Sequence, residues 1–152
     1  MKNFEFLIID DGSSDSTLEI LNSYAQIDSR VKVLSKQNTG LTDSLNVGLR
    51  VARGDWIARL DADDVCEPLR LETQISAVRS NPKLVFLGSG LTIIDENSRS
   101  LARYSYPVQH SGLLANLTLA LKFPSHSSAF FMSYVAISIG GYRQAIKRAE
   151  YW

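Results

Sequence analysis

Two clusters of acidic residues are the part of this sequence best suited to chemistry. Asp10 and Asp11 end one apolar run, and Asp61, Asp63 and Asp64 follow another. Neighbouring carboxylates repel one another when they are withdrawn from water. A divalent cation such as Mg²⁺ or Mn²⁺ removes that cost, because it prefers carboxylate oxygen and water as ligands. The second cluster is therefore a candidate metal site.

The spacing within the second cluster supports two interpretations. In an extended backbone, residues two apart point to the same side, so Asp61 and Asp63 are predicted to point together from the end of a strand. Alternatively, Asp64 caps the next helix and the other two acids are solvated turn residues. Short motifs arise often without function, so the surrounding elements must decide between the two.

Strands and helices alternate over the first part of the chain. Apolar runs predict strands at residues 4–9, 31–34, 56–60 and 84–87, and apolar positions at helical spacing separate them. This alternation predicts an α/β fold with a mostly parallel sheet and helices on both faces. Ligands of such sheets bind at the carboxyl ends of the strands. Both acidic clusters follow a strand, so we expect them at that edge.

The sequence changes character after about residue 90. Residues 91–104 have the pattern of an antiparallel hairpin, residues 112–121 of a poorly periodic helix, and residues 129–132 of another strand. A glycine-rich turn follows at residues 140–143. We therefore expect a small antiparallel portion beside the mostly parallel sheet, with no linker between separate domains.

Composition excludes several classes of protein. The chain of 152 residues has 16 basic and 16 acidic residues, which gives no sign of nucleic acid as a partner. Cys66 is the single cysteine, so an internal disulfide is excluded and a reducing compartment is favoured. The sequence shows neither an apolar run long enough to span a bilayer nor the layout of a signal peptide. We expect a cytoplasmic protein, with peripheral association at the inner face of the membrane left open.

Taken in order, the motifs resemble the inverting nucleotide-sugar glycosyltransferases of family 2. They are Asp-Asp-Gly-Ser-Ser-Asp-Ser-Thr at residues 10–17, Asn-Thr-Gly at 38–40, Asp-Ala-Asp-Asp at 61–64, Pro-Leu-Arg-Leu-Glu at 68–72 and Gly-Gly-Tyr-Arg at 140–143. The resemblance covers almost the whole chain. It implies the A-type glycosyltransferase fold, with a Rossmann-like nucleotide-sugar-binding part at about 1–90 and an acceptor-side part at about 91–152 of one domain.

The resemblance also implies a donor site and a metal. The donor is a nucleotide-diphospho-sugar, with uridine diphosphate as the default nucleotide, and the metal is Mn²⁺ or Mg²⁺ held through the Asp-Ala-Asp motif. The metal neutralises charge on the diphosphate leaving group. The residues implied to bind substrate are Asp10, Asp11, Asn38, Gly40, Asp61 and His126, and those implied to bind metal are Asp61 and Asp63. Alone, a histidine such as His126 is more often a structural hydrogen-bonding residue than a catalytic one or a metal ligand.

Inversion requires a carboxylate that takes the proton of the acceptor hydroxyl. The resemblance implies that an aspartate directly after the position of Glu150 takes this role, and that aspartate is absent here. Glu150 is the candidate to replace it; the alternative is a solvated terminal acid. The first strand of the family's fold is also missing before residue 4. We therefore expect a domain truncated at both ends and an isolated chain with little or no activity.

Two further functions remain open at this point. One is a module that binds nucleotide or metal without catalysis. The other is a phosphotransferase with an aspartate nucleophile at residues 61–64, for which Lys83 and Lys122 lack a convincing context. The family resemblance instead implies polysaccharide biosynthesis with a carbohydrate or lipid-linked acceptor.

Overall fold

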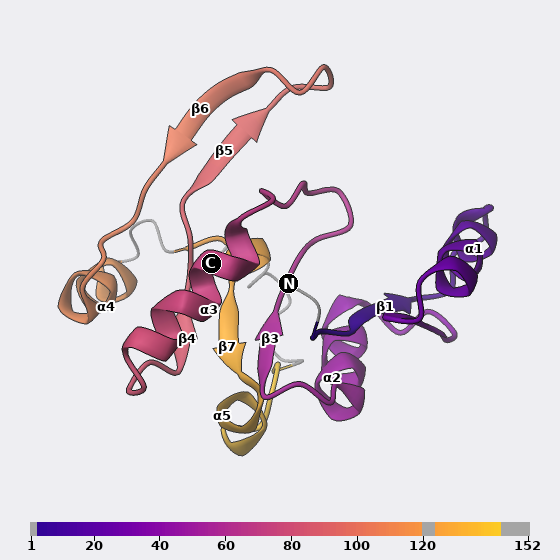
Figure 1. Ribbon diagram of the computed structural model, residues 1–152, viewed down its shortest axis with the longest axis horizontal. Helices are drawn as coiled ribbons and strands as arrows, with labels where there is room; N and C mark the ends of the chain where they lie inside the picture. The colour runs from indigo at the N-terminus through magenta and orange to yellow at the C-terminus, as the bar shows by residue number, and fades with distance from the viewer. Residues whose placement is uncertain (1–2, 120–123, 144–152) are drawn as a thin grey trace. The chain divides into compact units, whose positions relative to one another are not determined.

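The computed structural model describes residues 3–119 and 124–143. Its elements alternate along the N-terminal part of the chain (Figure 1). In order they are β1 (Phe6–Asp10), α1 (Thr17–Ile27), β2 (Val31–Ser35), α2 (Leu41–Val51), β3 (Trp56–Ala58), α3 (Arg70–Ser80), β4 (Phe86–Leu87), β5 (Leu91–Ile94), β6 (Ser100–Tyr104), α4 (His110–Thr118), the 3₁₀ turn η1 (His126–Ser128), β7 (Phe130–Met132) and α5 (Ser133–Ser138). The predicted α/β class is confirmed.

The described residues form two compact units. One contains the chain up to Ile57 together with the residues from Met132 onward, and the other contains Ala58 to Phe131. This division follows spatial contacts, and it does not test the predicted functional division near residue 90. Each unit is described separately below.

The parallel pairing predicted for the N-terminal strands is confirmed in the first unit. Strand β1 pairs with β2 from Phe6 opposite Val31 to Asp10 opposite Ser35. Helix α1 provides the crossover that parallel neighbours require. Because the two strands end level with one another, the loops that follow them leave the same edge of the sheet.

Helix α2 closes the first unit against the C-terminal turn. Leu49 of this helix is one of the few buried apolar residues in the described part of the chain. Gly141 has a φ of +68°, and a Cβ on it would lie 2.6 Å from Asn46 Oδ1. Only glycine tolerates both that backbone conformation and that approach, so the Gly-Gly-Tyr-Arg turn is fitted to α2.

The remaining strands form a sheet of order β3-β7-β4 and a separate hairpin. Strand β4 pairs antiparallel with β7, with Phe86 opposite Phe131 and Leu87 opposite Phe130. The predicted hairpin is confirmed by the antiparallel pair β5 and β6. The helix expected at 112–121 begins earlier, at His110, and its α-helical part ends at Thr118.

Candidate functional site

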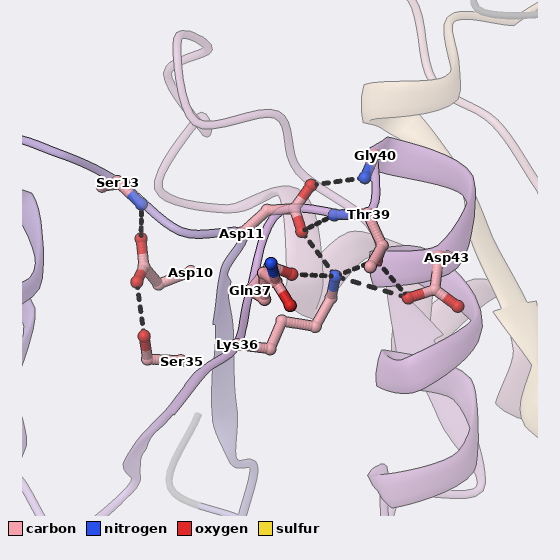
Figure 2. A network of polar contacts seen from close by, with 9 residues as sticks. All are labelled: Asp10, Asp11, Ser13, Ser35, Lys36, Gln37, Thr39, Gly40 and Asp43. Carbon is pink, nitrogen blue, oxygen red and sulfur yellow. Dashed lines mark hydrogen bonds and ion pairs between the residues drawn. The ribbon is translucent and has the colours of Figure 1, made fainter.

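Asp10 is held rigidly at the end of β1. Its carboxylate accepts a hydrogen bond from the Ser13 backbone N–H at 3.1 Å and another from Ser35 Oγ at 2.7 Å (Figure 2). These bonds from Ser13 and Ser35 lower the pKa of Asp10. The residue is only 4% exposed, so Asp10 joins the two parallel strands and contributes little surface to a ligand.

The carboxylate of Asp11 receives donors from the loop that precedes α2. It accepts the backbone N–H groups of Thr39 at 3.0 Å and Gly40 at 2.9 Å, and Lys36 Nζ lies 2.5 Å away. The Lys36 hydrogen bond, followed by the Thr39 amide, lowers the pKa of Asp11 to about 2. Its side chain nevertheless remains 24% exposed. Asp11 is therefore ionised, oriented and still accessible.

Lys36 lies between two carboxylates. In Figure 2 its ammonium group faces Asp11, Thr39 and Asp43 together. The Asp43 carboxylate oxygen is 3.3 Å from Nζ, and it also accepts the Thr39 hydroxyl at 2.5 Å. The hydrogen bond to Asp11 raises the pKa of Lys36, with a smaller contribution from Asp43. Lys36 and Asp43 were not predicted as site residues. Their positions on either side of the Asn-Thr-Gly motif could have indicated them.

The structure brings Gly40 to Asp11 and Asn38 to the neighbouring Gly12. Gly12, directly after Asp11, has a φ of +80°, and a Cβ there would lie 2.9 Å from the Asn38 backbone nitrogen. Gly40 has a φ of +92° and donates its N–H to Asp11. Glycine at both positions lets the two loops approach closely.

In the second unit, Asp61 is held by two partners. Its carboxylate forms an ion pair with Nη1 of Arg59, a residue only 7% exposed, and its backbone N–H donates to Ser127 Oγ at 2.9 Å. The Asp61 side chain is 37% exposed. Sequence analysis missed Arg59 and Ser127, because neither position belongs to a short acidic motif.

The acidic motif itself forms a turn. Strand β3 ends at Ala58, and the Asp64 N–H donates to the Asp61 carbonyl at 3.2 Å. The argument that placed Asp61 and Asp63 on one side of an extended strand therefore does not apply here. The proposed helix cap is also wrong, because α3 begins at Arg70 with Leu69 as its cap residue, well after Asp64.

Asp63 is exposed, and no residue in the described ranges donates a hydrogen bond to it or forms an ion pair with it. Within residues 3–119 and 124–143, no group of three or more His, Cys, Asp or Glu side chains could hold a metal by itself. Mg²⁺ usually binds one or two carboxylates together with substrate phosphates and water. A metal at Asp61 and Asp63 would therefore have to be shared with a phosphate-bearing ligand.

His126 begins the short turn that carries Ser127. Burial lowers the pKa of His126, and the charge of Arg59 lowers it further, whereas Asp61 raises it. The structure thus brings His126 into the electrostatic neighbourhood of Asp61. Glu150 lies outside the described residues, and its role stays a prediction.

No helix in the described parts of the chain is both long and apolar enough to cross a membrane.

Comparison with known proteins gives the family. The family model described as glycosyl transferase family 2 matches residues 1–140. An uncharacterized glycosyltransferase of Haemophilus influenzae is 37% identical over 69% of this chain and 33% of its own length. The glycosyltransferase GlyG of Streptococcus pneumoniae is 34% identical over 58% of this chain and 30% of its own. The amylovoran biosynthesis glycosyltransferase AmsE of Erwinia amylovora is 28% identical over 97% of this chain and 55% of its own.

The chain thus spans between 30% and 55% of the length of these three relatives. The family match covers the Asp10–Asp11 loop, the Asp61 turn and the His126–Ser127 segment alike. With these residues matched over most of its length, the chain belongs to glycosyl transferase family 2.

Proposed function

We propose that this chain binds a nucleotide-diphospho-sugar and contributes to transfer of the sugar to an acceptor hydroxyl with inversion. The observation that carries the proposal is the state of the Asp61 turn. One carboxylate of this turn is oriented by a buried arginine, and the next, Asp63, is exposed. Such a pair suits a diphosphate that brings its own metal ion.

We assign recognition of the nucleotide base to Asp11. The Asp11 carboxylate is oriented by its donors and is 24% exposed, so it still presents an acceptor position to a ligand. An N–H group on the edge of uracil fits this position. Asp10 is buried against Ser13 and Ser35, which favours Asp11 over Asp10.

The metal role is assigned to the Asp61 turn. When bound, Mn²⁺ or Mg²⁺ would act as a Lewis acid that neutralises charge on the departing diphosphate. Asp63 would hold the metal, together with Asp61 of the same turn. The ion pair with Arg59 fixes the orientation of the Asp61 carboxylate.

Inversion is a single displacement. The acceptor oxygen bonds to the anomeric carbon as the bond from that carbon to the diphosphate oxygen breaks, and a carboxylate removes the acceptor proton. We assign removal of this proton to Glu150. We assign a contact with the substrate to His126. A carbohydrate or lipid-linked acceptor in polysaccharide biosynthesis is our choice, because one relative is named for amylovoran biosynthesis. We place the reaction in the cytoplasm, a reducing compartment that suits a chain with Cys66 as its single cysteine.

Calorimetric titration of the chain with uridine diphosphate tests the donor and metal sites. We expect binding that is tighter with Mn²⁺ than with a chelator, and an Asp11→Asn variant that binds more weakly under both conditions. Equal affinity with and without Mn²⁺ would contradict the metal role. Mass spectrometry of a panel of uridine-diphosphate sugars incubated with the chain then separates transferase or donor hydrolysis from binding alone.

A further inference from the structure

The first residue of α3 reaches back to the backbone that carries Asp61. Arg70 Nη2 donates to the Arg59 carbonyl at 2.8 Å and to the Ala129 carbonyl at 3.2 Å. Ala129 also accepts the Arg59 N–H at 2.9 Å, so these two backbone segments are already neighbours. One guanidinium group therefore joins the chain before the Asp61 turn to the chain after the His126 turn.

Gln74, one helical turn further along α3, completes this arrangement. Its Oε1 accepts Arg70 Nε at 3.2 Å, and its Nε2 donates to the Ser128 carbonyl at 3.0 Å. Gln74 is only 5% exposed, although it is polar and lies on a helix. Buried polar groups of this kind are costly unless every partner is present. The pair Arg70 and Gln74 is therefore a connected unit.

The backbone carbonyl of Arg59 depends on Arg70 for its hydrogen bond. Strand β3 ends at Ala58, and the carbonyl of Arg59 receives its hydrogen bond from Arg70. Hydrogen bonds from charged donors are stronger than neutral ones. Arg70 thus binds the carbonyl of Arg59, which lies two residues before Asp61. Gln74 binds the carbonyl of Ser128, which follows Ser127, and the Ser127 hydroxyl accepts the Asp61 N–H.

We propose that Arg70 and Gln74 are positioning residues that hold the Asp61 turn in the geometry required for metal-dependent donor binding. The inference rests on the proposed function, because it assigns a purpose to the position of Asp61. Neither side chain contacts the donor. They act through the Arg59 and Ser128 carbonyls, so their effect is confined to the part of the affinity that depends on the metal.

The size of the expected effect follows from residues that orient metal ligands in other proteins. Removing a group that orients a metal ligand typically weakens metal affinity by about 10- to 100-fold. We expect Arg70→Met and Gln74→Met to reduce Mn²⁺-dependent binding of uridine diphosphate within this range. Arg70→Lys should keep some of the Mn²⁺-dependent affinity for uridine diphosphate but less than wild type. An ammonium group lacks the planar fork that reaches two carbonyls and Gln74 together.

The experiment is a titration of the full chain with uridine diphosphate, with Mn²⁺ and separately with a chelator. For Arg70→Met and Gln74→Met, the ratio of the two affinities should fall by about tenfold or more while the affinity in chelator stays within about twofold of wild type. Arg79→Met, an exposed arginine in the last turn of the same helix, is the matched control and should leave the ratio unchanged.

Three other outcomes of this titration would overturn the inference. If both affinities fall together, or if a variant does not fold, Arg70 and Gln74 are general structural residues and the inference is overturned. If neither affinity changes while wild type responds to Mn²⁺, the inference fails and the proposed function stands. If wild type itself shows no response to Mn²⁺, the proposed metal role fails and this inference fails with it.

Discussion

Asn46 and Tyr142 exchange two hydrogen bonds although 96 residues separate them in the sequence. Asn46 Nδ2 donates to the Tyr142 carbonyl at 2.8 Å, and the Tyr142 N–H donates to Asn46 Oδ1 at 2.9 Å. The side-chain amide thus satisfies both backbone groups of one residue. This pair fixes the Gly-Gly-Tyr-Arg turn on α2, the helix whose preceding loop binds Asp11.

Replacing Asn46 by alanine should destabilise the first unit. The substitution leaves the N–H and carbonyl of Tyr142 without this partner, and unmade hydrogen bonds of partly buried groups cost about 1–3 kcal/mol. We expect a loss of that order in the free energy of unfolding, measured by urea denaturation. Asn22→Ala, at an exposed position of α1, is the control and should change stability by less than about 0.5 kcal/mol. Equal effects of the two variants would show that the Tyr142 pair adds no stability.

Gly12→Ala should destabilise the protein more than Gly40→Ala. Both glycines have a φ between +80° and +92°, so alanine introduces backbone strain at each. Only at Gly12 does the new Cβ also meet backbone atoms, at 2.9 Å from the Asn38 nitrogen, whereas nothing lies within 4 Å at Gly40. Thermal unfolding of the two variants isolates this steric contact. The prediction is wrong if Gly40→Ala has the lower melting temperature.

Acid should remove the stability contributed by Asp11. Its pKa is about 2 in the folded protein against an ordinary value of 3.8, so the folded state favours the ionised form. This contribution is complete above the ordinary pKa and disappears as the pH falls through the folded pKa, between about pH 4 and pH 2. Asp11→Asn should therefore show a flatter decline of stability over this interval in urea titrations. Asp55→Asn, at an exposed position, should follow wild type.

Asp63 and Asp64 should differ in their effect on the donor. Asp63→Ala is expected to remove the Mn²⁺-dependent part of uridine diphosphate binding, because Asp63 is the proposed ligand. Asp64→Ala should keep most of it, since the contact that Asp64 makes to Asp61 in the turn uses backbone atoms. Titration calorimetry of both variants with Mn²⁺ measures the difference. Loss of binding in the Asp64 variant alone would reverse the assignment.

The elements of the first unit could be predicted because their signals are local. The apolar run before Asp10 and the helical spacing of Leu41, Leu45 and Leu49 each lie within one segment, and β1 and α2 follow them closely. The position of Asp10 and Asp11 after a strand was predictable for the same reason.

Features that depend on distant partners could not be predicted in this way. Asp61 beside Ser127 and Arg70 beside Ala129 result from the pairing of segments about which local periodicity carries no information. The turn at Asp61 also defeats the period-two argument, since that argument requires an extended backbone. Lys36 was missed because a lysine after a strand has no distinctive pattern until Asp11 and Asp43 lie beside it.

The link between Asn46 and Tyr142 has a consequence for synthesis on the ribosome. Ser35 and Asp10 are 25 residues apart, so their bond can form soon after both emerge, whereas Asn46 must wait for a residue 96 positions later. At about 5–20 residues per second, that interval lasts roughly 5–20 s. During it, α2 has been made but the turn that covers Asn46 and Leu49 has not. We expect this helix to be the part of the nascent chain most exposed to chaperones and proteases.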